Sequence, residues 1–179
     1  MDNTTKIKNW LTTNDLVLNE KQISLLLDYA DLVLSYSTEI NLISKNDREN
    51  IIERHLLDSL LALKVYAFQE GAQVADVGSG AGLPGLPIAI ARPDLQMNLI
   101  ESRRRRCLFL AKVVDNLGLT NVDVVNNRWE NLNLSYDVIL SRAFVNETEA
   151  RKVLIPHLNP GGALLYFAKL NQIKILKKS

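Results

Sequence analysis

The chain has 179 residues, of which 47% are hydrophobic and 23% are charged, and its formal net charge is +1. This size and balance are typical of one globular domain with a small appendage. No apolar run is long enough to cross a membrane, the first ten residues lack the apolar core of a secretory signal, and the single Cys107 can form no internal disulfide. We therefore expect a cytoplasmic protein, whereas a net charge near zero excludes neither nucleic acid nor another charged partner.

The first seventy residues have a helical pattern. Asn19 and Gln22 have the spacing of a capping box, and the apolar residues that follow, from Ile23 to Leu34, fall on one helical stripe. A second helix is predicted to begin near Asp47, with His55 on its inner face. The pattern predicts a helical N-terminal extension over residues 1–70 that packs on the rest of the chain.

From residue 74 the hydrophobic period changes to that of strands. Short β-branched runs, separated by helical or loop segments, lie at 73–78, 97–102, 122–127, 136–142 and 162–169. Such alternation is typical of an α/β fold in which crossover helices connect parallel strands. The clearest crossover is the helix predicted at 103–117, which Ser102 can cap and Gly118 ends. We expect a five-stranded core over residues 71–179.

A glycine-rich turn, ADVGSGAGLPGLPIA at residues 75–89, lies between a predicted buried strand and a helix. Backbone N–H groups and a helix N-terminus surround one small volume there, in which a ligand can lie against bare backbone. Gly80, Gly82 and Gly85 satisfy the dinucleotide-binding spacing, and Glu101, 21 residues after Gly80, stands where an acid binds ribose hydroxyls. A tight turn that needs glycine only for packing is the alternative.

Two details favour S-adenosylmethionine over a nicotinamide dinucleotide as the ligand. Asp76, two residues before Gly78, can approach the cationic amino acid end of S-adenosylmethionine, whereas a pyrophosphate there would be repelled. Pro84 and Pro87 also crowd the helix start that a pyrophosphate would approach. A nicotinamide-dependent oxidoreductase is the disfavoured alternative, because no catalytic acid is evident near a hydride site.

A basic run, Arg103 to Arg106, opens the helix at 103–117. Cations in a first turn oppose the helix dipole, each at a cost of about 0.3–1 kcal/mol at low salt. Bound RNA phosphate would relieve this cost, because arginine forks match phosphate oxygens. A solvated arginine face with one salt-bridged member is the alternative.

Several ordered motifs carry a resemblance to a known family. They are ADVGSGAGLPGLPIAIARPD together with NLIS, ERHLLDSL, ESRRRRCLFL, NNRWENL and ILSRAF. From about Asn41 to Lys169 the chain resembles the GidB/RsmG family, methyltransferases that modify guanine N7 in small-subunit ribosomal RNA. The resemblance implies a class I, Rossmann-like methyltransferase fold with a helical N-terminal extension, and S-adenosylmethionine as the cofactor. The partner it implies is small-subunit ribosomal RNA or an assembling ribosomal particle.

The resemblance also implies roles for individual residues. Gly78, Gly80 and Leu83 lie along the cofactor, Glu101 binds its ribose, Trp129 and Glu130 flank the adenine mostly through backbone, and Arg142 closes the site. The family's basic pair falls at Arg105 and Arg106, which favours RNA contacts for these two. His55 and Asp58 are expected to tie the N-terminal helices to the core, and His157 receives no role. No cluster of ligands has the spacing of a metal site.

Methyl transfer from a sulfonium to guanine N7 requires no general base, because the attacking lone pair carries no proton. The sequence offers no Ser/His/Asp, Cys/His or paired-carboxylate arrangement, which agrees with such a reaction. Positioning of the reactants contributes about 7–11 kcal/mol in favourable cases. Arg142 and Lys169 are the candidates for orienting the guanine.

The end of the chain departs from the family pattern. The family's chains add a helix and two strands after the fifth strand, whereas only ten residues follow Lys169 here, and Leu170 replaces the usual glycine. We expect the last strands to be missing and the strand at 162–169 to form an exposed apolar edge through which the chain self-associates. A truncated, catalytically silent member that retains cofactor or RNA binding is therefore a further alternative.

Overall fold

The computed structural model describes residues 2–131, 134–143 and 145–178. Leu132 and Phe144, the last residues of two of the family motifs, lie outside these ranges. The predicted capping box is formed, because the backbone N–H groups of Asn19 and Gln22 each donate to the side chain of the other at 2.9 Å. Within the described ranges, no helix combines the length and the apolar content that crossing a bilayer requires.

The part of the chain before the first strand is helical, as predicted. In chain order the described helices there are α1 (Asn3–Thr13), α2 (Glu20–Tyr36), α3 (Lys45–Arg48), the π-helix η1 (Ile52–Leu57) and α4 (Asp58–Val65). The single helix predicted from Asp47 is wrong in detail, because α3 ends at Arg48 and the helix that follows begins as a π-helix.

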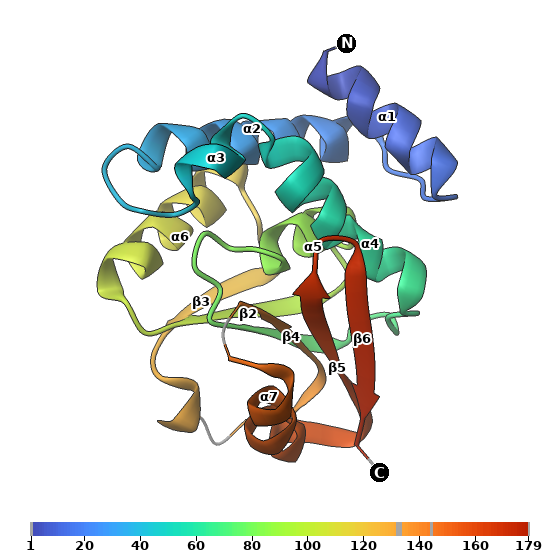
Figure 1. Cartoon of the computed structure of the whole chain (residues 1–179), viewed down its shortest axis with the longest axis vertical. Coiled ribbons are helices and arrows are strands. Elements are labelled where there is room, and N and C mark those ends of the chain that lie inside the picture. Colours follow the sequence, from blue (N-terminus) through green and yellow to red (C-terminus); the bar gives the residue numbers. More distant parts are fainter. Residues whose placement is uncertain (1, 132–133, 144, 179) are drawn as a thin grey trace.

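The centre of the molecule is a sheet of six strands among the described residues, in the order β3-β2-β1-β4-β5-β6 (Figure 1). The strands are β1 (Gln73–Val77), β2 (Gln96–Glu101), β3 (Val122–Asn126), β4 (Tyr136–Arg142), β5 (Leu158–Lys169) and β6 (Gln172–Lys177). The first five pair in parallel, and β6 pairs antiparallel to β5. The predicted α/β class and all five predicted strands are confirmed. The strand order reverses between β1 and β4, where open α/β sheets bind ligands.

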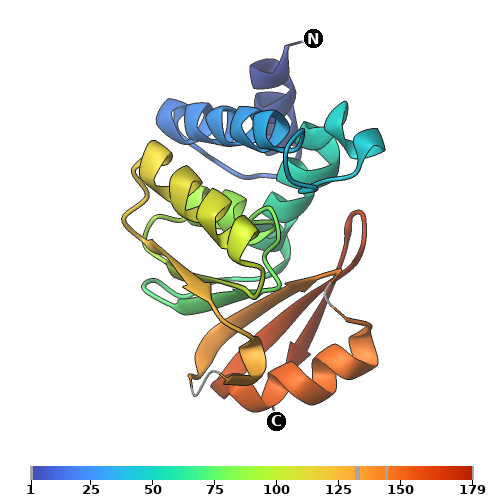
Figure 2. The ribbon, with the colours of Figure 1, turned by 90° about the vertical axis from the view of Figure 1, so that its left-hand side faces the viewer.

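Helices cover both faces of this sheet. On one face lie α5 (Gly85–Ala91) and α6 (Arg104–Leu117), with α2 packed over them, and on the other lies α7 (Glu147–Leu154) (Figure 2). Two buried apolar clusters correspond to these faces, and the larger one unites the N-terminal helices with α5, α6 and the sheet. Gly118 ends α6 in the left-handed region, as predicted. At the other end of α6 the N-cap residue is Arg103 rather than Ser102, and no side chain caps the helix there.

The residues after Lys169 turn back and form β6, contrary to the prediction. Asn171, in the turn, has a positive φ of 59°, which asparagine tolerates. The strand β5 is therefore paired on both sides, with β4 and with β6, and is not an exposed edge. The outer strand carries Lys174 and Lys177, and lysines on an edge strand disfavour pairing with another chain.

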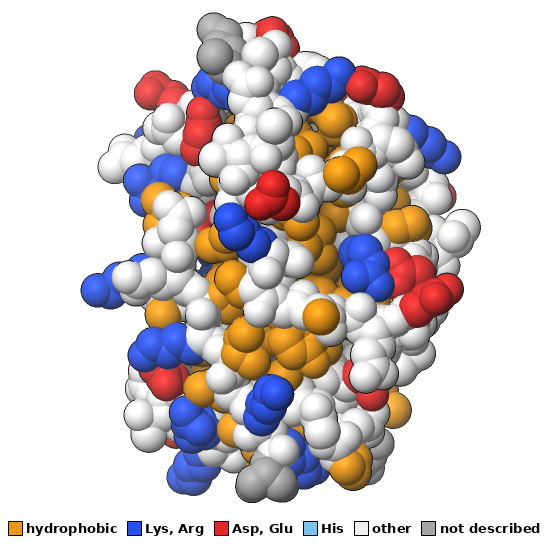
Figure 3. Space-filling model, turned by 90° about the vertical axis from the view of Figure 1, so that its right-hand side faces the viewer, with side chains coloured by type: hydrophobic (Ala, Val, Ile, Leu, Met, Phe, Trp, Pro, Cys, Tyr) orange, Lys and Arg blue, Asp and Glu red, His pale blue; other side chains and the backbone are white. Residues whose placement is uncertain are grey.

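Self-association was predicted through an exposed edge of β5, and the structure has no such edge because β6 covers it. The side of the molecule that presents α4 and β6 does carry apolar side chains, which gather between lysines and arginines (Figure 3). Val65, Leu170 and Ile175 are 40%, 44% and 38% exposed, respectively. These apolar side chains are only partly exposed, and apolar residues of this kind are ordinary on protein surfaces.

Candidate active site

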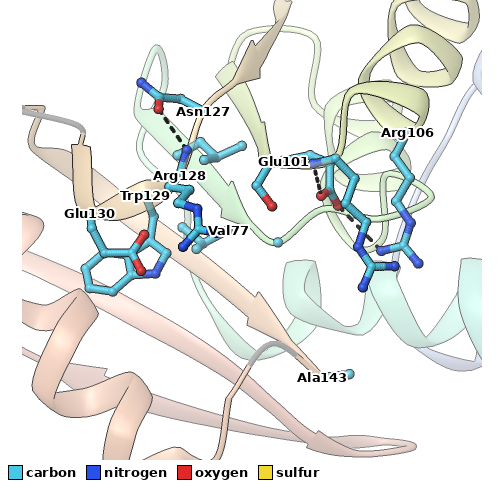
Figure 4. Close-up of a pocket in the computed structure, with 12 residues that line it drawn as sticks. Val77, Glu101, Arg106, Asn127, Arg128, Trp129, Glu130 and Ala143 are labelled. Carbon is cyan, nitrogen blue, oxygen red and sulfur yellow. Dashed lines mark hydrogen bonds and ion pairs between the residues drawn. The ribbon is translucent and has the colours of Figure 1, made fainter.

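A cleft of about 360 Å³ lies where the strands β1 and β2 end. Its walls are the glycine loop at Gly78, the end of β2 with the start of α6, and the segment 127–130 that follows β3. Figure 4 shows Glu101 and Arg106 on one side of this space, Trp129 and Glu130 on the other, and Val77 between them. The volume lies within the range of about 300–1,000 Å³ that is usual for ligand pockets.

The glycine loop needs glycine partly for its own packing. Gly82 has a φ of +94°, and a Cβ atom there would lie 2.3 Å from Cδ1 of Leu86. A Cβ atom at Gly85 would lie 2.6 Å from Cδ2 of Leu99 and 2.8 Å from a carboxylate oxygen of Asp76. Two glycines of the dinucleotide-like spacing are therefore required by neighbouring protein atoms. Gly78, in contrast, lines the cleft.

Asp76 lies behind the glycine loop, which differs from the expectation that its carboxylate approaches a ligand. The residue is 1% exposed and is not part of the cleft wall. Its Oδ2 accepts a hydrogen bond from the backbone N–H of Gly85 at 3.0 Å, at the start of α5. Burial raises the pKa of Asp76 to about 7. The carboxyl group therefore holds the loop against the first turn of α5.

Glu101, the acidic residue expected to bind a ribose, lines the cleft together with Glu130. Its Oε2 accepts a hydrogen bond from the backbone N–H of Gly80 at 3.0 Å, and its Oε1 accepts one from the N–H of Arg103 at 2.8 Å. Each oxygen of a carboxylate has a second lone pair, so Glu101 can still accept hydroxyl groups of a ligand. The residue thus connects the glycine loop, the end of β2 and the start of α6.

Three residues of the arginine run, Arg103 to Arg105, are exposed, and Arg106 is half-buried. Arg103 and Arg106 line the cleft. The Nη1 of Arg106 lies 3.6 Å from Glu101 Oε2, and its Nη2 donates to the backbone oxygen of Asn41 at 3.2 Å. The run therefore matches the alternative of a solvated face with one ion-paired member, and Glu101 is the anion that pairs with it. Arg106 bridges the cleft and the N-terminal extension, and only Arg105 of the predicted RNA-binding pair is exposed.

The segment after β3 contributes the wall opposite Glu101. Trp129 and Glu130 begin the short 3₁₀ helix η2 (Trp129–Asn131), and both line the cleft. The ring of Trp129 packs edge to face on His157, with 5.8 Å between ring centroids. His157, to which the sequence assigned no role, thus supports the tryptophan. Reasoning from sequence also missed Asn127 and Arg128 as cleft residues, although their place just after a parallel strand was a usable signal.

Other predicted site residues lie outside the cleft wall. Leu83 is 9% exposed and does not line the cleft, and Lys169 is exposed at the end of β5. Arg142 ends β4, and its neighbour Ala143 is the residue that faces the cleft. None of the described residues form a group of three or more potential metal-ligating side chains.

Arg142 instead contacts the N-terminal extension. Its Nη1 lies 3.2 Å from Oδ2 of Asp58, and its Nη2 donates to the backbone oxygen of Arg54 at 3.0 Å. Asp58 therefore does connect the helices of the extension to the sheet, as expected. His55 is half-buried, and burial and then the positive charge of Arg142 lower its pKa to about 4.

Comparison with solved structures identifies the fold. A SAM-dependent methyltransferase from Aquifex aeolicus is 22% identical with a TM-score of 0.54, and the match covers 68% of each chain. Coclaurine N-methyltransferase, solved with N-methylheliamine and SAH, is 14% identical with a TM-score of 0.59 over 91% of this chain and 56% of that one. The fold, with a cleft at the carboxyl ends of β1 and β2, is that of the class I S-adenosylmethionine-dependent methyltransferases.

Comparison of sequences identifies the family. The family model GidB, described as rRNA small subunit methyltransferase G, matches residues 22–178, so the chain belongs to the GidB family. Relatives named ribosomal RNA small subunit methyltransferase G include one from Clostridium beijerinckii, 35% identical over 84% of this chain and 65% of its own length. A relative of the same name from Chromobacterium violaceum is 41% identical over 84% of this chain and 72% of its own length. The chain thus spans about two thirds of the length of the curated relatives that it matches.

Proposed function

We propose that the chain binds S-adenosylmethionine in the cleft at the ends of β1 and β2 and transfers its methyl group to guanine N7 in small-subunit ribosomal RNA. Membership of the GidB family supports this reaction. The observation that carries the proposal is the arrangement of Glu101, which lines the cleft beside the glycine loop and accepts the N–H of Gly80. An acid at this point of an open α/β sheet is suited to ribose hydroxyls.

The residues of the cleft fit this cofactor. Glu101 keeps lone pairs for the ribose, the Trp129–Glu130 segment offers an edge for the adenine, and Gly78 leaves backbone open to the methionine end. When bound, S-adenosylmethionine supplies an electrophilic methyl group. The chain then needs only to hold guanine in line with that group, since N7 attacks with a lone pair that carries no proton.

The cationic side chains around the cleft are suited to RNA. Arg103, Arg106 and Arg128 line the cleft, and Arg105 is exposed beside them. Such a group attracts phosphate and favours a base that RNA structure leaves exposed. Arg142 and Lys169, at the ends of the neighbouring strands β4 and β5, are the candidates for orienting the guanine.

Calorimetric titration with S-adenosylmethionine tests the cofactor site, with a nicotinamide dinucleotide as the control ligand. We expect saturable one-site binding of S-adenosylmethionine, and affinity lower by about 10-fold to 100-fold in Glu101→Gln, because a charge-assisted hydrogen bond is lost. Asp123→Asn, an exposed acid on the neighbouring strand, is the matched control and should bind as the parent chain does. Thermal melting shows whether each variant is folded.

Transfer of a labelled methyl group to naked small-subunit RNA and to assembled subunits tests the reaction. Incorporation at guanine N7 in either substrate supports the proposal, and comparison of the two shows which is modified. Cofactor binding without incorporation in either substrate would favour the catalytically silent alternative. Tighter binding of the nicotinamide dinucleotide than of S-adenosylmethionine would favour the oxidoreductase.

A further inference from the structure

Three segments that are far apart in the sequence meet at the carboxylate of Asp58. Its Oδ1 accepts a hydrogen bond from the backbone N–H of Asn171 at 2.6 Å, and its Oδ2 lies 3.2 Å from Nη1 of Arg142. These contacts join the first residue of α4, the turn between β5 and β6, and the last residue of β4. Figure 1 shows the turn between β5 and β6 reaching the helices of the N-terminal extension.

In the ion pair between Asp58 and Arg142, the aspartate is buried and the arginine is partly exposed. The side chain of Asp58 is 1% exposed and that of Arg142 is 19% exposed. Burial raises the pKa of Asp58, and the Asn171 N–H and then Arg142 oppose this effect. A buried ion pair is poor evidence for stability, because well-packed apolar residues of similar volume are often at least as stable. A requirement for orientation explains the choice of charged residues better.

A second contact fixes the same guanidinium. The Nη2 of Arg142 donates to the backbone oxygen of Arg54, which lies within the π-helix η1. Turns of π-helix within α-helices occur frequently at functional sites. The guanidinium of arginine is planar and carries five N–H donors. The hydrogen bond to Arg54 and the ion pair with Asp58 together restrict its plane, and Nη1, which makes no hydrogen bond among the described residues, remains available to a ligand.

We propose that Asp58 is a positioning residue, which together with the Arg54 carbonyl orients Arg142 at the end of β4 for contact with the guanine. This inference rests on the proposed function in its last step only. The orientation of Arg142 itself concerns the chain without any ligand. The same carboxylate also holds the β5–β6 turn next to Arg142. The conformation of that turn and the orientation of Arg142 therefore both depend on one side chain.

Hydrogen exchange of the Arg142 guanidinium, followed by NMR, tests the orientation in the full chain without RNA. The signals are assigned by their loss in Arg142→Lys. Asp58→Asn keeps an oxygen that accepts the Asn171 N–H but removes the charge, and it should speed exchange at Arg142 by about tenfold or more. Asp94→Asn, which breaks the ion pair with Arg92, is the control and should leave Arg142 unchanged. Equal exchange in Asp58→Asn and the parent chain would overturn the proposal.

Methylation kinetics test the consequence for the reaction. We expect Asp58→Asn to lower kcat by about 10-fold to 100-fold with unchanged affinity for S-adenosylmethionine, because a misplaced orienting group costs rate rather than cofactor binding. In an Arg142→Ala chain the same substitution should cause no further loss, since Asp58 acts through Arg142. A further loss as large as in the parent background would show a merely structural role and overturn the proposal.

The two measurements separate this inference from the proposed function. If the parent chain transfers no methyl group, the proposed function fails, whereas the exchange measurement still decides whether Asp58 holds Arg142. If Asp58→Asn does not fold, Asp58→Ser takes its place in the exchange measurement, because its hydroxyl can accept the Asn171 N–H. Slow exchange at Arg142 in that variant would overturn the proposal, and fast exchange would support it.

Discussion

Asp76→Asn removes a buried ionisable group from behind the glycine loop and changes the shape of the side chain very little. Burial raises the pKa of Asp76 from 3.8 to about 7, because the ionised carboxylate has lost its contact with water. Between these two pKa values the folded chain holds a proton that the unfolded chain has released. The free energy of unfolding contributed by this group is therefore highest at low pH and falls as the pH rises to about 7.

The size of this effect follows from the two pKa values. The slope is about 1.4 kcal/mol per pH unit while the pH lies between them, and the loss from pH 5 to pH 8 is about 2.5 kcal/mol. Asparagine cannot ionise, so the variant lacks this loss. We expect the free energy of unfolding of Asp76→Asn, relative to that of the parent chain, to rise by about 2.5 kcal/mol over this range. The new amide adds a further difference that does not change with pH.

Urea unfolding of both chains at pH 5, 6, 7 and 8 measures this difference. Other titrating groups are common to both chains and cancel in the comparison, to within about 0.5 kcal/mol for independent sites. Far-ultraviolet circular dichroism at each pH checks that the variant has the parent's helical content. A constant difference in stability across the four pH values would mean that Asp76 titrates in its ordinary range and that burial does not raise its pKa.

Two further predictions concern the loop at 78–85. Tyr29→Phe removes the fully buried hydroxyl that donates to the backbone oxygen of Ala81 at 2.9 Å, and it should cost about 1–3 kcal/mol of stability in urea unfolding. The variant should also bind S-adenosylmethionine more weakly; unchanged stability would show that the loop does not depend on this bond. Gly82→Ala places a Cβ atom against Leu86. The variant should either fail to fold, which thermal melting detects, or fold without binding the cofactor, which calorimetry detects. Its control is Gly118→Ala, where φ is also positive, at +61°, but nothing lies within 4 Å of the added Cβ atom, and it should cost only about 1–2 kcal/mol.

Local sequence patterns were sufficient to predict most of the fold. The capping box at Asn19 and the left-handed end of α6 at Gly118 depend on residues close together in the chain, and both are confirmed. β6 was missed because it exists only by pairing with β5, and the turn before it contains no glycine. The run of Ile173, Lys174 and Ile175, in which apolar and polar residues alternate, was the available signal. The π-helix at 52–57 carries no comparable local signal.

The candidate site shows the same division between local and distant causes. Glu101 was predicted to bind a ribose because spacing from the glycine loop places it at the end of the next strand, and it does line the cleft. The inward turn of Arg106 depends on the backbone oxygen of Asn41, which is 65 residues away. The burial of Asp76 likewise depends on how α5 packs against β1. Such contacts between distant segments have no pattern in the sequence from which they can be read.

The contact between Asn171 and Asp58 has a consequence for the order of folding. The two residues are 113 positions apart, so the bond can form only after a long section of chain has been ordered. Contacts of this separation slow folding, because the loss of chain entropy precedes the gain. We expect the strands β1 to β4 and the N-terminal helices to assemble first and the hairpin of β5 and β6 to dock last. The guanidinium of Arg142 would then reach its final orientation only in the closing step of folding.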